Sequence, residues 1–367
     1  MSAPCAKSAA LAQKRGKMLK RKLGIIFGTM VIFSVVSYIL IAAFGRKPAV
    51  RGQEERTILT SFYPVYIITQ NLTKDMEGVK VVNLTENQTG CLHDYQLTTK
   101  DMLLLETADL LVINGGEMEL FIEQAVEKLT GLTVIDSCDG ISLLTGAKHE
   151  HDHGDGTGGR ESEENDDHSD DSGAGRESAE NDNHSGAAEE SAVNGHVWMD
   201  TARYLEQIHT VADGLCAAFP GQEAQIRENE RSYREKITEL AEEYAAFKEQ
   251  LSGLEVVTFH DAFAYLCDSL GIEVVHGLDL DADSALSAGE IAELTDEIRL
   301  HGVRYLFAEK GNGDIAQQVA KETGCDVLYL DPVTSGSSSL DAYLTAMCEN
   351  LEQLKNILRE RTPLQDF

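Results

Sequence analysis

Short apolar runs alternate with stretches of helical spacing in two parts of the chain. The first part predicts strands at residues 55–62, 79–85, 109–114 and 132–137, with helices at 66–75, at 98–107 and from 119 onward. The second part predicts strands at 255–260, 272–277, 304–309 and 326–331, with helices around 265, at 287–300, from 314 and at 340–358. Strands that alternate with helices indicate parallel sheets, so we expect an α/β fold with two lobes, each a mainly parallel sheet flanked by helices.

A long helix is predicted between the two parts, at residues 220–251. This stretch has no Gly or Pro beyond Gly221. Its apolar residues recur at helical spacing: Ile226, Tyr233, Ile237, Leu240, Tyr244 and Phe247. At 1.5 Å per residue such a helix runs about 40 Å, long enough to join both lobes rigidly. We therefore expect an N-terminal lobe at 55–219, a linker helix at 220–251 and a C-terminal lobe at 252–367.

The N-terminus carries a membrane signal. A basic tail at residues 1–22 precedes an uncharged apolar run at 23–45. About 22 residues at 1.5 Å each match a hydrocarbon core of about 30 Å, and the basic tail would stay in the cytoplasm. The rest of the chain is then extracytoplasmic, anchored by this segment, or secreted if the segment is a cleaved signal.

Residues 148–194 form an acidic stretch rich in Asp, Glu, Gly, Ser and His. It has too few aliphatic residues to bury a core, so we expect a disordered loop within the N-terminal lobe. It contains a near duplication, GRESEENDDHS at 159–169 and GRESAENDNHS at 175–185. Its imidazoles would hold divalent metal loosely, the alternative being a solvated linker with incidental histidines: His149, His151, His153, His168 and His184.

Composition narrows the function classes. The formal net charge of −31 opposes binding to nucleic acid and suits a protein that attracts cations. The 7 cysteines are scattered without a C-x-x-C pair, which argues against a thiolate zinc site or a redox motif. We expect them to be small core residues, and their spacing leaves a disulfide among the extracytoplasmic ones open.

Three histidines outside the acidic stretch are stronger candidates for a metal site. His93 follows the strand at 79–85, His196 follows the acidic stretch, and His260 ends the strand at 255–260. Strand ends are where α/β lobes present their ligands. Each histidine alone is better explained as a core or surface residue, but three in short polar turns beside apolar anchors indicate a shared site.

Several motifs resemble the substrate-binding proteins of zinc and manganese ABC importers, the cluster A-I metal receptors. These are GCLHDYQLTTKD at 90–101, NGGEMELFIE at 114–123, GHVWMD at 195–200, VVTFHDAFAYL at 256–266 and YLDPV at 329–333. The resemblance implies a metal site in the cleft between two lobes, an importer permease and its ATPase as partners, and a monomer. It assigns one ligand to each of four motifs: His93, His196, His260 and Asp331.

The metal preference follows from this donor set. In manganese members of the family, the residue at the third ligand position usually resembles Glu, whereas this chain has His260 there. Three imidazoles and a carboxylate also suit tetrahedral Zn²⁺, whereas manganese favours more oxygen donors. Zn²⁺ would be the transported ligand rather than a catalytic cofactor. The family's Pro before the first and second histidines is Leu92 and Gly195 here, which we expect to loosen those turns, and no cysteine follows the apolar run for lipid attachment.

Neighbouring acids are candidates for orienting the imidazoles. Asp94, Asp261 and Glu309 could hydrogen-bond the second ring nitrogen of a ligand. Asp94 and Asp261 are equally well explained as helix caps, and Glu309 could replace Asp331 as the fourth ligand.

The sequence bears on three other functions. A zinc hydrolase needs an open metal position, but the chain has no H-E-x-x-H or G-x-S-x-G motif and a fourth protein ligand closes the site, so we do not expect an enzyme. A manganese receptor, and a zinc-buffering surface adhesin that serves no permease, remain as alternatives.

Overall fold

The computed structural model describes residues 55–86, 92, 95–146, 193–278, 280, 286–310 and 313–361. The chain divides into two units, 1–54 and 55–367, and all described residues belong to the second unit. The expected basic tail at 1–22 and apolar run at 23–45 therefore lie outside the described residues, as does nearly all of the acidic stretch. No helix within the described ranges combines the length and apolar character that a membrane span requires.

The first sheet has four parallel strands in the order β2-β1-β3-β4. Its strands are β1 (Arg56–Thr60), β2 (Val79–Asn83), β3 (Leu110–Ile113) and β4 (Thr133–Asp136). The helices between them are α2 (Tyr63–Leu72), α3 (Thr99–Thr107) and α4 (Leu120–Val126). The Thr98 hydroxyl and the Asp101 carboxylate cap each other's backbone at the start of α3, which fixes where that helix begins.

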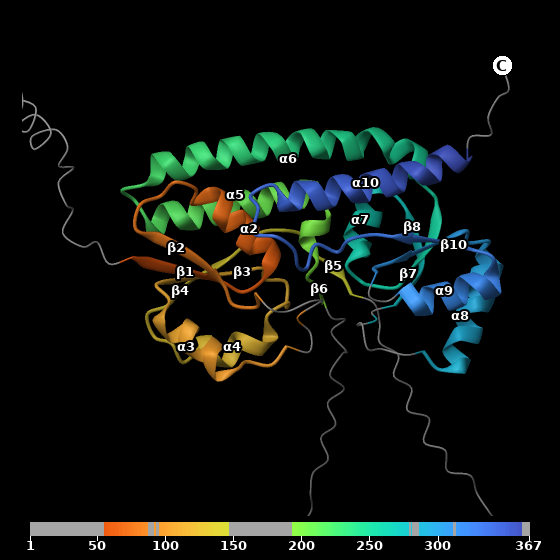
Figure 1. The fold of residues 1–367 in the computed structure, drawn as a ribbon, viewed down its shortest axis with the longest axis horizontal. Coiled ribbons are helices and arrows are strands. Elements are labelled where there is room, and N and C mark those ends of the chain that lie inside the picture. Colours follow the sequence, from red (N-terminus) through yellow and green to blue (C-terminus); the bar gives the residue numbers. More distant parts are fainter. Residues whose placement is uncertain are drawn as a thin grey trace, which may run out of the picture. The chain divides into compact units, whose positions relative to one another are not determined.

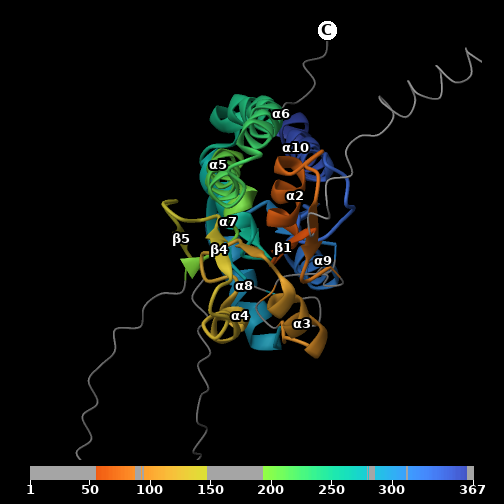
Figure 2. The same cartoon turned by 90° about the vertical axis from the view of Figure 1, so that its left-hand side faces the viewer.

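Alternate side chains along β1 and β3 lie on opposite faces of this sheet. Ile58 and Leu110 belong to the main core beneath α2 and α5 (Thr201–Ala218), whereas Leu59 and Leu111 belong to a smaller core with α3 and α4. Figure 2 shows α2 and α5 on one side of the strands and α3 and α4 on the other. Helices on both faces explain why β3, a central strand of the sheet, is apolar throughout.

The second sheet repeats this plan, with parallel strands in the order β10-β9-β7-β8. Its strands are β7 (Glu255–Thr258), β8 (Glu273–Gly277), β9 (Tyr305–Ala308) and β10 (Asp326–Tyr329). The accompanying helices are α7 (Phe263–Leu270), α8 (Ala288–His301), α9 (Gly313–Thr323) and α10 (Ala342–Arg361). Val256 faces the main core, while Val257 faces a separate core beneath α8 and α9.

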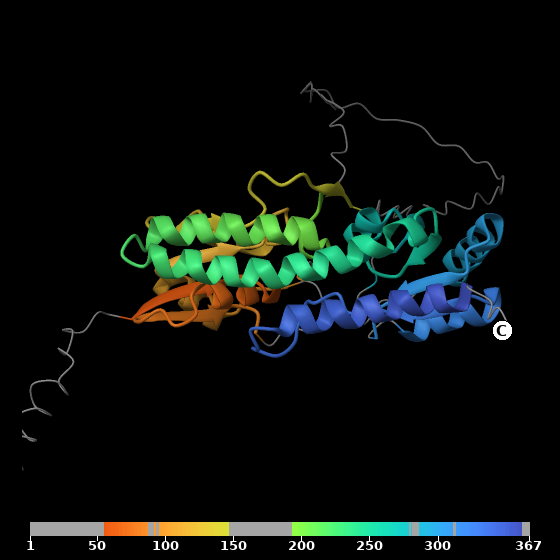
Figure 3. The ribbon, with the colours of Figure 1, turned by 90° about the horizontal axis from the view of Figure 1, so that it is seen from above.

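One helix packs along elements of both sheets. Helix α6 (Glu223–Leu251) has 29 residues and contacts α2 and α5 as well as α7 and α10. Figure 1 shows it running above both sheets, and Figure 3 shows α10 beside it. Asn229 of α6 donates to the Leu72 carbonyl, 2.9 Å, and the Tyr244 hydroxyl donates to the Met347 carbonyl, 2.7 Å. The predicted long helix and the predicted fold class are both confirmed.

A short hairpin and a 3-10 turn lead into the site. Strands β5 (Leu144–Thr145) and β6 (Val193–Asn194) pair antiparallel, and η1 (Val197–Met199) follows. The buried Tyr265 hydroxyl of α7 accepts from the Leu144 amide, 2.9 Å, and donates to the Asn194 carbonyl, 2.7 Å. The hairpin that bounds the acidic stretch is therefore bound to a helix of the second sheet.

The described cysteines are free, and their burial differs from the expectation in part. Cys138, Cys267 and Cys325 are buried, whereas Cys216 is half-buried and Cys348 is exposed. The expectation of core cysteines is wrong for Cys348, because that side of α10 faces solvent.

Candidate metal centre

His196 is buried, 1 % exposed, between β6 and η1. The Asn194 side-chain oxygen faces both its backbone nitrogen, 2.9 Å, and its ring Nδ1, 3.0 Å. The preceding Gly195 is packed tightly, since a Cβ there would lie 2.7 Å from the Gly116 carbonyl oxygen. The close approach of the two backbones therefore leaves room only for glycine at this position, and that Gly195 loosens the turn stays a prediction.

A buried polar network supports the same turn. Asn114 at the end of β3 donates from Nδ2 to the Gly195 carbonyl, 2.8 Å, and its Oδ1 accepts from Gln207, 3.0 Å. The Glu119 carboxylate accepts from the backbone nitrogens of Asn114, 2.7 Å, and Gly115, 3.0 Å, and from the Ser61 hydroxyl, 2.6 Å. Burial raises the pKa of Glu119 to about 7, against the opposing effect of these hydrogen bonds. The first sheet thus positions the backbone that carries His196.

His260 reaches the same place from the second sheet. It follows β7, is 2 % exposed, and its ring centre lies 5.3 Å from that of His196, with the ring planes at 83°. Its Nδ1 lies 3.6 Å from Oε2 of Glu309, which follows β9. Two imidazoles and a carboxylate from different strand ends are therefore neighbours.

Asp331 follows β10 and is held by its backbone. Asn350 of α10 accepts from the Asp331 amide, 2.7 Å, and donates to its carbonyl, 2.8 Å. The Asp331 residue is exposed, but nearby protein shields its carboxyl in part and so raises its pKa. The hydrogen bond from the Val333 amide opposes this increase, and the charges of Glu349 and Glu309 add to it. Carboxylates that repel one another in this way are stabilised by a cation.

The segments bearing these side chains are joined by further hydrogen bonds. The Trp198 indole donates to the Pro332 carbonyl, 2.8 Å, and the Tyr343 hydroxyl donates to the Trp198 carbonyl, 2.7 Å. Asn194 donates from Nδ2 to the Asp261 carbonyl, 3.0 Å. The His196 turn is thus tied to the residues that follow Asp331 and His260.

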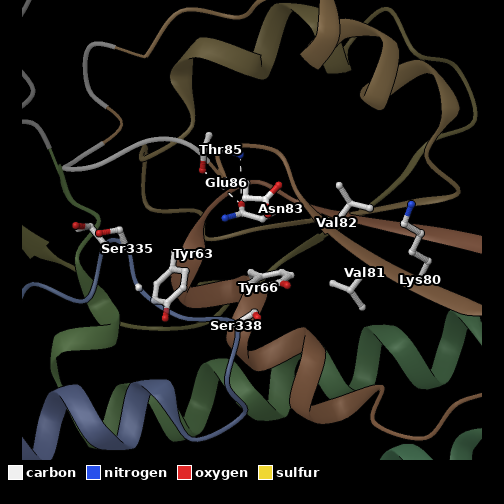
Figure 4. A pocket seen from close by; sticks show the side chains of 12 residues that line it. Tyr63, Tyr66, Lys80, Val81, Val82, Asn83, Thr85, Glu86, Ser335 and Ser338 are labelled. Carbon is white, nitrogen blue, oxygen red and sulfur yellow. Dashed lines mark hydrogen bonds between the residues drawn. The ribbon is translucent and has the colours of Figure 1, made fainter.

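A cavity of about 580 Å³ opens beside these segments. Figure 4 shows side chains from α2, from β2 and the residues after it, and from the stretch 334–338 around the cavity. The Tyr63 hydroxyl donates to the Ser337 carbonyl across it, 2.7 Å, and burial together with the Asp331 charge raises the pKa of Tyr63 to about 12. The cavity therefore lies between the β2 side of the first sheet and the segment that joins β10 to α10, and its lining includes none of His196, His260, Glu309 and Asp331.

The structure brings some of the predicted site residues together and leaves others undescribed. His196, His260 and Glu309 are neighbours, and Asp331 interacts electrostatically with Glu309. In the part of the chain that the structure describes, no three His, Cys, Asp or Glu side chains are placed closely enough to hold a metal ion. The predicted residues that lie outside the described ranges are His93, Asp94, His149, His151, His153, His168 and His184.

Asp261 contributes to the site through its backbone carbonyl, which accepts from Asn194. Two more residues that were not predicted, Trp198 and Asn350, also bind backbone groups near the candidate ligands. Ala262, not Asp261, occupies the N-cap of α7, and it makes no side-chain cap. Sequence reasoning missed Asn194, Trp198 and Asn350 as supports of the site, because each acts on a backbone group that only the fold brings near. The one available signal was the position of Asn194, two residues before a candidate ligand.

The chain is similar to known proteins in sequence and in fold. Residues 58–357 match the family described as "Zinc-uptake complex component A periplasmic". Zinc-binding protein AdcA of Streptococcus pyogenes serotype M3 is 25 % identical over 333 residues, which are 89 % of this chain and 60 % of the relative. The chain thus spans about 60 % of the length of the streptococcal relatives.

Two further matches cover nearly all of the compared chain. The high-affinity zinc uptake system protein ZnuA of Bacillus subtilis is 24 % identical over 333 residues, 88 % of this chain and 94 % of the relative. The Zn(II)-bound ZnuA-like domain of Streptococcus pneumoniae AdcA shares the fold, with a TM-score of 0.62 at 23 % identity over 82 % of this chain and 98 % of that domain. The family model covers most of the chain, and the protein belongs to the ZnuA family of zinc-uptake binding proteins.

Proposed function

We propose that this protein is an extracytoplasmic receptor that captures Zn²⁺ and delivers it to the permease of an ABC importer, which its ATPase drives. Zn²⁺ is the cargo, and no reaction is catalysed. Family membership supports this proposal. The observation that carries it is that His196, on a turn bonded to the end of β3, lies beside His260, which follows β7 of the second sheet.

The spacing of the two imidazoles fits a shared Zn²⁺. At Zn–N distances of about 2.0–2.1 Å and a tetrahedral angle, two ring centres lie about 5 Å apart. The observed separation is 5.3 Å, with the rings nearly perpendicular. Both rings are buried, so few waters compete for the nitrogens. Edge-to-face packing alone gives similar spacings, and the measurement of bound metal separates the two explanations.

The proposed ligands are His93, His196, His260 and Asp331. Glu309 has two roles open to it, because its carboxylate lies beside His260 Nδ1 and acts electrostatically on Asp331. In the first role its carboxylate accepts a hydrogen bond from Nδ1–H of His260 and so directs Nε2 to the ion. In the second role it replaces Asp331 as the fourth ligand. Either set closes a tetrahedral site against water.

The donor set favours zinc over manganese as the cargo. Three imidazoles with one carboxylate suit Zn²⁺, whereas Mn²⁺ prefers oxygen donors and higher coordination. The formal charge of −31 raises the local concentration of cations, and the acidic stretch 148–194 adds loosely binding imidazoles. We propose that this stretch collects ions, that the folded site fixes one of them, and that the apolar run 23–45 anchors the protein.

Removal of one ligand tests the site. His260→Ala in the full-length protein should weaken Zn²⁺ binding by more than about 100-fold, because even the loss of an outer partner costs 10–100-fold. His301→Ala is the matched control, since that half-exposed imidazole lies near Glu255, 3.6 Å, at the end of α8. Competition against a chromophoric chelator measures both affinities. Equal affinities of the two variants would contradict the proposed site.

Uptake by cells tests the cargo and the delivery step. Cells that lack this gene should lose uptake of labelled zinc under chelation and keep uptake of labelled manganese. Loss of manganese uptake alone would indicate a manganese receptor. Normal uptake of both metals, in cells with no second receptor, would indicate a zinc-buffering surface protein.

A further inference from the structure

Asn194 is a buried amide, 2 % exposed, at the end of β6. Its side chain makes three contacts: Oδ1 with the His196 backbone nitrogen, 2.9 Å, Oδ1 with His196 Nδ1, 3.0 Å, and Nδ2 with the Asp261 carbonyl, 3.0 Å. The backbone carbonyl of Asn194 accepts a hydrogen bond from the Tyr265 hydroxyl, 2.7 Å. Every polar group of this amide side chain is therefore engaged beside the candidate metal centre.

These contacts determine which end of the amide is oxygen. A backbone N–H only donates, so the amide atom that faces the His196 nitrogen must be the acceptor. A backbone carbonyl only accepts, so the atom that faces Asp261 must be the NH₂ group. Both ends give the same orientation, which removes the usual ambiguity of an asparagine flip.

The orientation in turn selects the tautomer of His196. Because Oδ1 cannot donate, the ring nitrogen 3.0 Å away must carry the proton for this contact to be a hydrogen bond. The neutral ring then has its lone pair on Nε2. We infer that Asn194 is a positioning residue that holds His196 as the Nδ1–H tautomer and so assigns Nε2 to the ion. The zinc part of this inference rests on the proposed function, whereas the tautomer part does not.

The same side chain also relates the two histidines to one another. Its Nδ2 bond ends on the carbonyl of Asp261, the residue directly after His260. A single side-chain amide therefore connects the ring of His196 to the backbone beside His260. The Tyr265 hydroxyl of α7 holds the residue itself, because it donates to the backbone carbonyl of Asn194. Loss of the side chain should affect the orientation of the His196 ring and its distance from His260 together.

The test compares three variants of the full-length protein. Asn194→Ala removes all three side-chain contacts, and Asn194→Asp keeps the oxygens that face His196. Asn229→Ala is the control, because Asn229 is also a buried amide, bonded to the carbonyls of Leu72, 2.9 Å, and Lys74, 2.8 Å, away from the site. Asn229→Ala should therefore lower stability much as Asn194→Ala does, without a change at His196.

The first readout needs no zinc. Long-range ¹H–¹⁵N correlation spectra of the metal-free protein report which ring nitrogen carries the proton, with the His196 signals assigned by their loss in His196→Gln. We expect Nδ1–H in the unmodified protein, in Asn194→Asp and in Asn229→Ala, and loss of this preference in Asn194→Ala. An Nε2–H ring in the unmodified protein, or an unchanged tautomer in Asn194→Ala, overturns the inference.

The second readout is affinity for Zn²⁺ alone, measured by chelator competition. Asn194→Ala should weaken binding 10–100-fold, as removal of the partner of a ligating imidazole does elsewhere. Asn194→Asp should bind nearer to the unmodified protein than to Asn194→Ala. Equal loss in both would contradict a tautomer role. If the unmodified protein itself did not bind Zn²⁺ tightly, the proposed function would fail. The spectra of the metal-free protein would still decide the tautomer.

Discussion

Glu119 should make the stability of the protein depend on pH in a defined direction. This buried carboxyl supports the turn before His196, and burial raises its pKa from 4.5 to about 7. A group whose pKa is higher in the folded state stabilises the fold below the pKa of the unfolded chain, and this contribution is lost as the pH rises through the folded value. Glu119 should therefore destabilise the fold progressively between about pH 4.5 and pH 7.

The magnitude follows from the size of the shift. A difference of about 2.5 pKa units at 1.36 kcal/mol each gives about 3 kcal/mol, most of it between pH 5 and pH 8. Glu119→Gln removes the ionisation but keeps the shape. From pH 5 to pH 8 the unmodified protein should therefore lose about 2–3 kcal/mol of unfolding free energy relative to Glu119→Gln.

Urea unfolding of both metal-free proteins at the two pH values measures this difference. All other titrating groups are common to the two chains, so they cancel in the comparison. A difference in unfolding free energy that stays constant within about 0.5 kcal/mol between the two pH values would refute the reasoning, because surface substitutions alone account for changes of that size.

The remaining predictions concern the metal centre. The emission of Trp198, the only tryptophan in the chain, should change on zinc binding because its ring lies 5.2 Å from that of His196, and titration of the fluorescence checks this. Asn350→Ala should lower the unfolding free energy by about 1–3 kcal/mol in denaturant melts and weaken zinc binding, because it leaves backbone groups of Asp331 unsatisfied. Zinc affinity should fall below about pH 6, where imidazoles gain protons, as measured by competition across pH. Deletion of residues 148–192 should reduce the number of bound ions in calorimetry while one tight site remains.

The architecture was largely predictable because its signals are local. Apolar runs and capping residues placed most elements within a few residues, as with α8, which begins after the Ser287 and Glu290 capping box. Helix α2 begins earlier than predicted, at Tyr63, because Pro64 is tolerated in a first helical turn. Family membership confirms the expected receptor, as opposed to an enzyme, and confirms the resemblance on which it rested.

Helix α5 was missed although the chain carries its signals. Asp200 caps it by accepting from the Ala202 amide, 2.8 Å, and the buried Tyr204, Ile208 and Val211 recur at helical spacing. The interpretation of the motif at 195–200 as a metal-binding turn does not include a helix start. The same six residues both present His196 and begin the helix that packs against α6.

The site was predictable only in part. The end of the parallel strand β7 indicated the place of His260, since such strand ends carry the ligands of α/β folds. His196 follows the antiparallel strand β6, so only its motif indicated that it belongs to the same site. The supports of the site were not predictable, because Asn194, Trp198 and Asn350 bind backbone groups of residues 261, 332 and 331. Backbone carbonyls carry no sequence signal, so these contacts depend on the tertiary arrangement alone.

The most direct test of the central claim is a crystal structure of the zinc-loaded protein. The account predicts a single ion with Nε2 of both His196 and His260 at about 2.0–2.1 Å, completed by His93 and by one carboxylate, Asp331 or Glu309. An ion bound without either His196 or His260, or held only by side chains of the acidic stretch, would contradict it.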